Sequence, residues 1–366
     1  MPGVASSAPV APPRPAKLWM PRRVLVTPAA VEHPHGRAIA ERCARLGIDV
    51  EHLPANRLTG LRGENERDTY RRAKSTLAVV VSPPGERKLQ PIPPSADWQF
   101  HIARGCPAHC QYCYLAGSLP GPPVTRVFAN LGEILGNLDD FVGRGTVTSR
   151  SKARSHEGTT FEASCYTDPL GIEHLTGSLA CTIEHFGRRS DASQLRFTTK
   201  FDAVDGLLGL DHRGRTRARF SVNAKAVTAF EGGTASLERR IAALARMAGA
   251  GYPVGLTIAP IMPVDGWREG YASLLRDVAG ALAPIDDLDL TVELITHRFT
   301  ATSKEILSGW YPATRLEMDE EVRTLKRTKF GAKKYVYPRG TMVELRGFLE
   351  SEIAATLPGA RILYWT

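Results

Sequence analysis

The sequence predicts an α/β fold: a partial, TIM-like barrel of six strand–helix units, with a small α/β module before it and a basic β-hairpin region after it. Over residues 96–300, short strand-like runs alternate with longer runs of helical spacing. This alternation favours parallel strands joined by right-handed crossovers. Six such units can be recognised, fewer than the eight of a complete barrel. The predicted strands lie in 99–103, 159–166, 194–200, 217–224, 252–261 and 288–297, and the predicted helices in 130–142, 173–187, 236–251 and 271–283.

The composition is that of a globular chain that buries a core. Of the 366 residues, 43% are apolar and 23% charged, which excludes a disordered protein, a coiled coil and a collagen-like fibre. No apolar run approaches the roughly 20 residues of a membrane span, so we expect no membrane association. The net charge of +9 favours a polyanionic partner such as nucleic acid. Six cysteines without a secretion signal indicate reduced thiols in a cytoplasmic protein.

Four regions follow one another along the chain. The N-terminal module shows a βαβ-like pattern, in which a strand in 22–30, a helix over 36–47 and a strand in 48–53 precede a further strand in 75–82. The C-terminal region is rich in Lys, Arg and Tyr and ends in a strand-like piece. The predicted regions are a disordered Pro-rich tail (1–21), the module with its linker (22–95), the barrel (96–300) and a C-terminal extension (301–366).

The strongest local signal is the segment GCPAHCQYCYL, in which Cys106, Cys110 and Cys113 directly follow the first predicted barrel strand. In such α/β folds, active sites form where loops leave the carboxyl ends of strands. Three thiolates from one loop can bind three irons of a cubane [4Fe-4S] cluster and leave the fourth iron without a protein ligand.

Three other interpretations of these cysteines are less well supported. Zinc would need four ligands, and His109 could be the fourth, but the CxxHCxxC spacing is too crowded for an ordinary zinc finger. A closed electron-transfer cluster would need a fourth cysteine nearby, whereas the next one along the chain is Cys165. Three structural thiols meeting by chance is the least specific interpretation, so the sequence favours a cluster with one open iron.

A CxxxCxxC motif after the first strand of a six-unit barrel resembles the radical S-adenosylmethionine (radical SAM) superfamily. Within that superfamily the chain resembles the spore photoproduct lyase family, from residue 22 to the end. Many stretches in the same order make this resemblance more specific than the cysteine motif alone. The matching stretches are RRAKSTLAVVV, GCPAHCQYCYL, FEASCYTDPLGIEHLTGSL, LRFTTKF, RFSVNA, GYPVGLTIAPI, GWREGY, ELITHRFT, KKYVYP and LYWT.

The resemblance implies a carbon–carbon lyase that repairs DNA. In that family a [4Fe-4S] cluster and S-adenosylmethionine give a 5′-deoxyadenosyl radical, which abstracts hydrogen from the spore photoproduct, the thymine dimer 5-thyminyl-5,6-dihydrothymine. The linking bond then breaks, and two thymines are restored. The implied partners are ultraviolet-damaged DNA with its lesion flipped out of the stack and an external one-electron reductant of flavodoxin or ferredoxin type.

The resemblance also implies residues that quench the product radical. Cys165, in FEASCYTD, matches the family's proposed hydrogen donor, and Tyr112 and Tyr114 flank a cluster cysteine where a phenol can relay a hydrogen atom. A thiol suits this task because its S–H bond is weaker than the C–H bond that forms. Without the resemblance, Cys165 would be buried filler, and the two tyrosines would be pocket walls.

Contacts with S-adenosylmethionine follow in the same way. The last two residues of the second barrel strand match backbone positions near the methionine amino group, and Thr167 replaces a ribose-contacting residue that is usually Ser. Lys200 and Ser221 match residues that hold the methionine carboxylate, for which an ammonium and a hydroxyl are suitable partners. Taken alone, Lys200 would be a solvated strand end. The candidate cofactor-binding residues are Ala163, Ser164, Thr167, Lys200, Ser221 and Asn223.

Candidate substrate contacts lie toward the C-terminus. In the basic segment KRTKFGAKKYVYPRG, aromatic residues that include Tyr337 alternate with charges, a pattern that suits phosphates and an extruded base. The family usually carries an Arg-Tyr pair here, but this chain has Lys329 and Phe330, which lack the planar fork and the hydroxyl. His297 and Arg298 end the sixth strand, either as substrate contacts or as a satisfied polar pair.

Two alternatives to lesion repair of this type remain open. The Lys329–Phe330 departure favours a paralogue that acts on another pyrimidine lesion or another nucleic acid. A nucleic-acid-binding iron–sulfur protein without turnover is the other alternative. The presence of Cys165, Tyr114 and Lys200 argues against it, because a passive cluster needs neither a hydrogen donor nor a carboxylate clamp.

Overall fold

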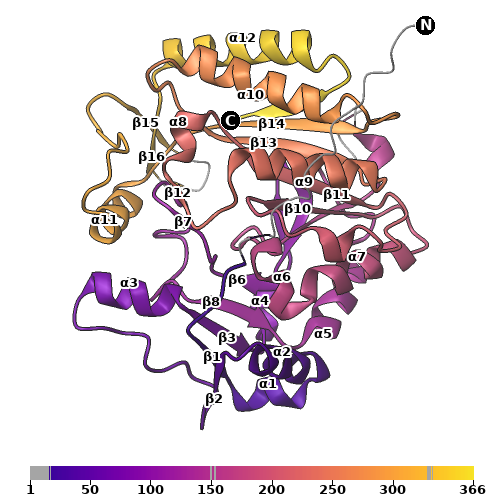
Figure 1. Ribbon diagram of the computed structural model, residues 1–366, viewed down its shortest axis with the longest axis vertical. Coiled ribbons are helices and arrows are strands. Elements are labelled where there is room, and N and C mark those ends of the chain that lie inside the picture. The colour runs from indigo at the N-terminus through magenta and orange to yellow at the C-terminus, as the bar shows by residue number, and fades with distance from the viewer. Residues whose placement is uncertain (1–15, 17, 149–150, 152–153, 328–330, 332) are drawn as a thin grey trace, which may run out of the picture.

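The structure is a computed structural model that describes residues 16, 18–148, 151, 154–327, 331 and 333–366. Two sheets form its frame, a small one built mainly from the N-terminal part and a larger, curled one (Figure 1). No helix in the described ranges has the length and apolar character that a membrane crossing needs. The predicted tail, 1–21, lies mostly outside the described residues.

The small sheet has the strand order β2-β1-β3-β8-β6, and β1 pairs in parallel with both β2 and β3. The predicted first strand, 22–30, ends at Val26, because Pro28 begins a short helix. Strands β8 and β6 come from the segment after residue 95, so the sheet extends beyond the predicted module. Its elements are β1 (Arg23–Val26), α1 (Pro28–Glu32), α2 (Pro34–Arg45), β2 (Asp49–His52), α3 (Glu66–Lys74), β3 (Thr76–Val80), α4 (Pro84–Arg87), β6 (Ala103–Arg104) and β8 (Thr125–Phe128).

The larger sheet has the order β17-β14-β13-β11-β10-β9-β5-β4. Its parallel strands from β5 to β14 are the six predicted barrel strands, and the sheet curls into an open barrel (Figure 1). The predicted partial six-unit barrel is therefore confirmed, and the C-terminal strand β17 adds to it in parallel with β14. The strands are β4 (Gln90–Ile92), β5 (Ala96–Phe100), β9 (Thr160–Ala163), β10 (Gln194–Thr199), β11 (Thr216–Val222), β13 (Val254–Ile261), β14 (Leu290–Thr296) and β17 (Arg361–Trp365).

Helices cover the outer face of the barrel. Helix α7 packs on β10, α9 on β11, and α12 on α10. Helix α9 begins at a conventional cap, where the Ser236 side chain accepts the Arg239 N–H. The larger helices of this region are α5 (Leu131–Gly136), α7 (Ser178–Arg188), α9 (Leu237–Gly249), α10 (Trp267–Leu282), α11 (Ala301–Trp310) and α12 (Arg339–Thr356), with the short helices α6 (Glu173–Thr176) and α8 (Lys225–Thr228) between them.

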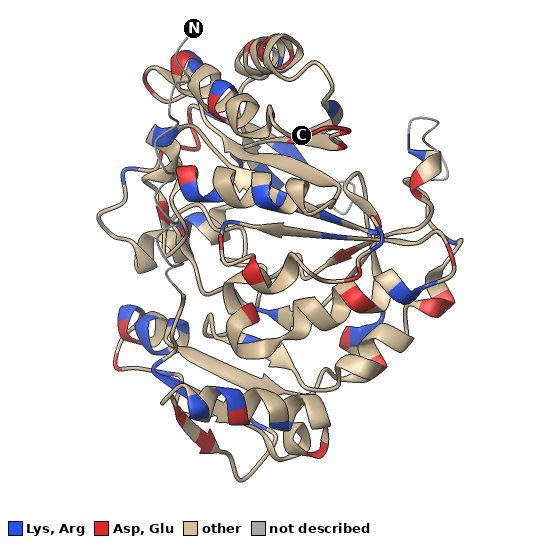
Figure 2. Cartoon of the chain, turned by 45° about the vertical axis from the view of Figure 1, so that its right-hand side comes forward, with Lys and Arg blue, Asp and Glu red and all other residues tan. Residues whose placement is uncertain are grey.

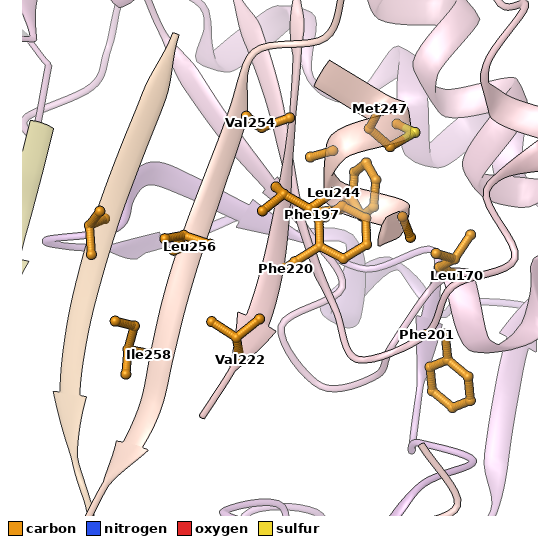
Figure 3. Packing of buried hydrophobic residues seen from close by; sticks show 14 of the residues in the cluster. Leu170, Phe197, Phe201, Phe220, Val222, Leu244, Met247, Val254, Leu256 and Ile258 are labelled. Atoms are coloured by element: carbon orange, nitrogen blue, oxygen red, sulfur yellow. The ribbon is translucent and has the colours of Figure 1, made fainter. Parts of the chain in front are cut away.

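The barrel strands separate an apolar outer face from a polar inner face. Successive strand residues point to opposite sides, and on β11 Phe220 and Val222 join the apolar core beneath α9 (Figure 3). The residues that alternate with them, Arg219 and Ser221, are buried with polar partners. The interior of the barrel can therefore hold polar side chains while the core lies outside it.

The predicted basic hairpin is present in the C-terminal region. Strands β15 (Thr324–Arg327) and β16 (Lys333–Val336) pair antiparallel. The connection between them carries Lys329 and Phe330, which lie outside the described residues.

Replacing Leu256 by Ala tests the outer core. Leu256 is fully buried on β13 (Figure 3), so Leu256→Ala should lower the free energy of unfolding by about 2–5 kcal/mol, measured by urea denaturation. The exposed Val343 on α12 provides a control, since Val343→Ala should change that free energy by less than about 0.5 kcal/mol. Equal effects of the two substitutions would contradict the assignment of this core.

Candidate active site

The cysteine motif lies in a loop that follows β6 and is fixed by its backbone. Gly105 has φ +79°, and a Cβ at this position would lie 2.2 Å from the Val124 carbonyl oxygen, so a side chain does not fit. Further on, β7 (His109–Cys110) pairs antiparallel with β12 (Glu231–Gly232). The loop is thus attached both to the small sheet and to the barrel.

The three loop thiols lie close enough to influence one another. Burial raises the pKa of Cys106 to about 12, and the Lys74 ammonium opposes that rise. Burial also raises the pKa of Cys110, and Cys113 and Cys106 raise it further. No three His, Cys, Asp or Glu side chains in the described residues converge on a single metal ion. A cubane cluster does not require such convergence, because each thiolate binds a different iron, so the three cysteines fit that group.

Helix α3 contacts the cysteine loop through two side chains that sequence reasoning did not identify. The Lys74 ammonium donates to the carbonyl oxygens of Cys106 and Ala108. One turn earlier, the Tyr70 hydroxyl is hydrogen bonded to His109 Nδ1 at 2.9 Å. The only sequence signal was that Lys74 stands in the family-matching stretch RRAKSTLAVVV.

Glu231 is a second site residue that sequence reasoning missed. Its buried carboxylate accepts a hydrogen bond from the Tyr112 hydroxyl and lies 3.1 Å from Lys200 Nζ and 2.5 Å from Arg240. Lys200 and Arg240 keep its pKa below the ordinary value in spite of burial. The Tyr112 hydroxyl is therefore held by a carboxylate beside the predicted clamp.

Lys200 and Ser221, predicted to bind one carboxylate, lie together at the ends of adjacent strands. Lys200 Nζ is 2.5 Å from Ser221 Oγ and 3.3 Å from the Ala259 carbonyl oxygen. Asn223 is fully buried, and its side chain is engaged by the Pro260 carbonyl and the Tyr271 hydroxyl. These contacts favour a structural role for Asn223 over a cofactor contact.

The end of β9 supplies the other candidate cofactor contacts. Ala163 is the last residue of the strand, and Ser164, at φ 59°, turns the chain away from it. Ser164 Oγ accepts the Ile102 N–H at 3.0 Å. The Thr167 hydroxyl is buried and has no hydrogen-bond partner within the described part of the chain, as expected of a group whose partner is a ligand.

The inner face of the barrel carries buried charges that pair across strands. Arg219 contacts Glu162 from β9 and, at 2.6 Å, Glu293 from β14. Ser95 Oγ joins them, 2.5 Å from Glu162 and 2.6 Å from Arg219. Figure 2 shows Lys and Arg along strands of the barrel as well as on outer helices. Each carboxylate is held by a cation or a hydroxyl, as buried charges require.

Cys165 follows β9, next to this network. The Glu162 carboxylate of the network lies close enough to its thiol to act on it electrostatically. Burial and this carboxylate raise the pKa of Cys165 well above its usual value, against a smaller effect of Arg219. Cys165 therefore keeps its proton.

Tyr114 lies near both Cys165 and Cys113. Its side chain is 58% exposed, whereas the Tyr112 hydroxyl is occupied by Glu231. Of the two predicted relay tyrosines, Tyr114 is therefore the one whose side chain a ligand can contact.

The predicted substrate residues differ in their surroundings. His297 is 2% exposed, and its Nδ1 lies 3.2 Å from Arg323, so it is a satisfied buried group whose partner is Arg323 and not the expected Arg298. Tyr337 is also buried, with its ring centroid 3.5 Å from the guanidinium carbon of Arg323. Arg298 is exposed and lies near Lys334 of the hairpin, so it keeps the surface that a substrate contact needs.

Comparison with known proteins decides the family. The family profile described as spore photoproduct lyase matches residues 19–366. A curated spore photoproduct lyase from Bacillus subtilis (strain 168) is 41% identical over 350 residues, which cover 95% of this chain and 99% of the relative. The chain belongs to the spore photoproduct lyase family. A lyase of the same name from Clostridium acetobutylicum is 32% identical and covers 94% of this chain and 98% of its own length.

Solved structures of spore photoproduct lyase agree with this assignment. One, complexed with dinucleoside spore photoproduct, has a TM-score of 0.88 and 39% identity, covering 96% of this chain and 100% of that chain. A mutant with bound AdoMet and the same dinucleoside has a TM-score of 0.87 at equal coverage. The partial radical SAM barrel predicted from the sequence is confirmed.

Because of His297, the free energy of unfolding of this protein should fall in acid. Burial and Arg323 lower its pKa to about 3, whereas an unfolded His titrates near 6.5. Between pH 3 and pH 6.5 the imidazole binds a proton in the unfolded state but not in the folded state. The contribution of His297 to the free energy of unfolding is therefore complete above about pH 6.5 and declines as the pH falls. From pH 7 to pH 5 the loss from this residue should be about 2 kcal/mol. Urea denaturation should show His297→Gln losing less stability over that interval by this amount; identical pH dependence would contradict it.

Proposed function

We propose that this chain reverts the spore photoproduct in DNA to two thymines by radical SAM chemistry. The observation that carries the proposal is the proximity of the three-cysteine loop and the protonated Cys165. The Gly105 N–H, at the start of the loop, donates to the Tyr166 carbonyl oxygen at 2.8 Å, which ties the loop to the turn that carries Cys165. A thiol beside a cluster loop suits a hydrogen donor for a radical formed there.

The residues that would hold the cofactors are the candidates already described. Cys106, Cys110 and Cys113 would bind the [4Fe-4S] cluster, and the adjacent Lys200 and Ser221 would bind the methionine carboxylate of S-adenosylmethionine. When bound, the two cofactors together supply reductive generation of a radical that abstracts hydrogen from the lesion.

Thr167 would complete the cofactor site at the ribose. Its buried, unpartnered hydroxyl can both donate and accept a hydrogen bond. Lys200 is already held by Glu231 and Ser221, so its ammonium is oriented before a carboxylate arrives.

Cys165 would then quench the product. The S–H bond breaks homolytically, the hydrogen atom forms a C–H bond on the thymine radical, and the sulfur is left as a thiyl radical. Burial and the nearby Glu162 carboxylate assist by keeping the sulfur protonated. The exposed Tyr114 nearby can return a hydrogen atom from its hydroxyl to that sulfur, which restores the thiol and leaves a phenoxyl radical on Tyr114.

DNA would approach from the C-terminal side. Lys326, Arg327 and Lys333 are exposed on the hairpin, with Arg298 near its base. These charges suit phosphate contacts around a base flipped into the barrel. We propose the cytoplasm as the location and a reduced flavodoxin- or ferredoxin-like protein as the electron donor.

The direct test is repair of a defined lesion. Anaerobically reconstituted protein is incubated with dithionite, S-adenosylmethionine and dinucleotide spore photoproduct, and products are separated by chromatography. We expect thymine dinucleotide together with 5′-deoxyadenosine. Cofactor cleavage without repair would point to another lesion, as the Lys329–Phe330 departure allows, and a loaded cluster without cleavage would point to a non-catalytic protein.

Cys165→Ala should separate cofactor cleavage from clean repair. Without the thiol, the product radical lacks its donor, so thymine dinucleotide should fall several-fold while adducts increase and cofactor cleavage continues. The matched control is Cys181→Ala, because Cys181 is exposed on α7. Unchanged repair by Cys165→Ala would remove the residue from this role.

A further inference from the structure

Lys74 is a buried cation without an anionic partner. It is the last residue of α3, and it is 8% exposed. Its ammonium donates to the carbonyl oxygens of Cys106 and Ala108, and no carboxylate in the described ranges forms an ion pair with it. Carbonyl dipoles only partly replace water around an ammonium, so burial in this state is costly.

The acidic residues of α3 do not serve as partners. Asp68 is paired with Arg71 and Arg72 on the helix surface, and Glu66 lies against Gly309 of α11. The groups that interact electrostatically with Lys74 are instead the thiols of Cys106 and Cys113 and the His109 ring. The missing negative charge is therefore expected from the cysteine loop itself.

We infer that Lys74 is a built-in countercharge for the iron–sulfur cluster, which fastens the cysteine loop and makes the cluster easier to reduce. The inference rests on the proposed function, because it requires three thiolates bound to iron. Each electron that enters the cluster adds one negative charge near the ammonium. The Lys74 ammonium therefore stabilises the reduced cluster more than the oxidised cluster, and this difference is large in a buried site.

As the carrier of Lys74, the N-terminal module would have a role in the site. Lys74 directly precedes Ser75 and β3, a central strand of the small sheet, so the ammonium stands on a rigid support. Tyr70, one turn earlier, bonds to His109 and to Tyr311. Helix α3 accordingly contacts both the cysteine loop and α11, and Figure 1 shows α3 and α11 on the same side of the molecule. The module would fix both the position of the loop and the charge beside it.

The test compares Lys74→Met, which keeps the length of the stem and removes the charge, with two controls. Arg71→Met removes a cation from the exposed face of the same helix. Tyr70→Phe removes the hydrogen bond to His109 of the loop but leaves Lys74 in place. Three quantities are measured: the melting temperature of the apoprotein, the rate at which a chelator extracts iron from the reconstituted protein, and the cluster reduction potential from an anaerobic dithionite titration followed by optical spectroscopy.

We expect Lys74→Met apoprotein to melt at or above the wild-type temperature, because an unpaired buried charge has been removed. Its cluster should be extracted several-fold faster and have a more negative potential. Arg71→Met should match wild type in all three quantities, and Tyr70→Phe should speed extraction without shifting the potential.

Two results would overturn the inference. One is a Lys74→Met potential equal to wild type, and the other is a Lys74→Met apoprotein that no longer folds, which would make Lys74 a purely structural residue. Lys74→Gln, also neutral, is measured in parallel. If wild type itself takes up no cluster, the proposed function fails instead, and the two failures are distinguished.

Discussion

The site depends on one constraint: a loop with three thiols must keep its shape before any metal binds. Three separate parts of the chain fasten it. Lys74 holds its carbonyl oxygens from the N-terminal module, and β12, which carries Glu231, pairs with it from the barrel side. From the C-terminal region, the Thr314 hydroxyl donates a hydrogen bond to the Gln111 side-chain oxygen, at a distance of 2.5 Å. A loop fixed in this way loses little conformational freedom when ligands bind, which favours tight binding.

The barrel interior solves a related problem, because a polar cavity must be built without leaving charges unpaired. Arg219 meets Glu162 and Glu293 from strands on either side, and this network includes the carboxylate that acts on Cys165. The apolar residues of the same strands pack outward under the helices. Because the core lies outside the barrel, the interior can be shaped for chemistry while the helices on the outer face supply the hydrophobic stability.

The features that could be predicted from the sequence are those that short segments of the chain determine. The six barrel strands and the spacing of Cys106, Cys110 and Cys113 are properties of short segments, and they were predicted from the sequence. Glu231 and Lys74 were missed, because their roles arise from contacts between elements far apart in the chain. The same holds for the small sheet, since pairing of β3 with β8 crosses a long connection that local pattern does not encode.

Burial shifts the pKa of the four site cysteines in the same direction, but the charged residues beside them shift it in different directions. Burial raises the pKa of each thiol, but the cluster ligands must lose their protons and the hydrogen donor must keep its own. Lys74 favours the thiolates of Cys106 and Cys113, and Lys200 favours that of Cys110. Glu162 has the opposite effect on Cys165. These neighbours shift the four thiols in opposite directions without outweighing burial, so iron itself must displace the protons of Cys106, Cys110 and Cys113, whereas Cys165 keeps its own.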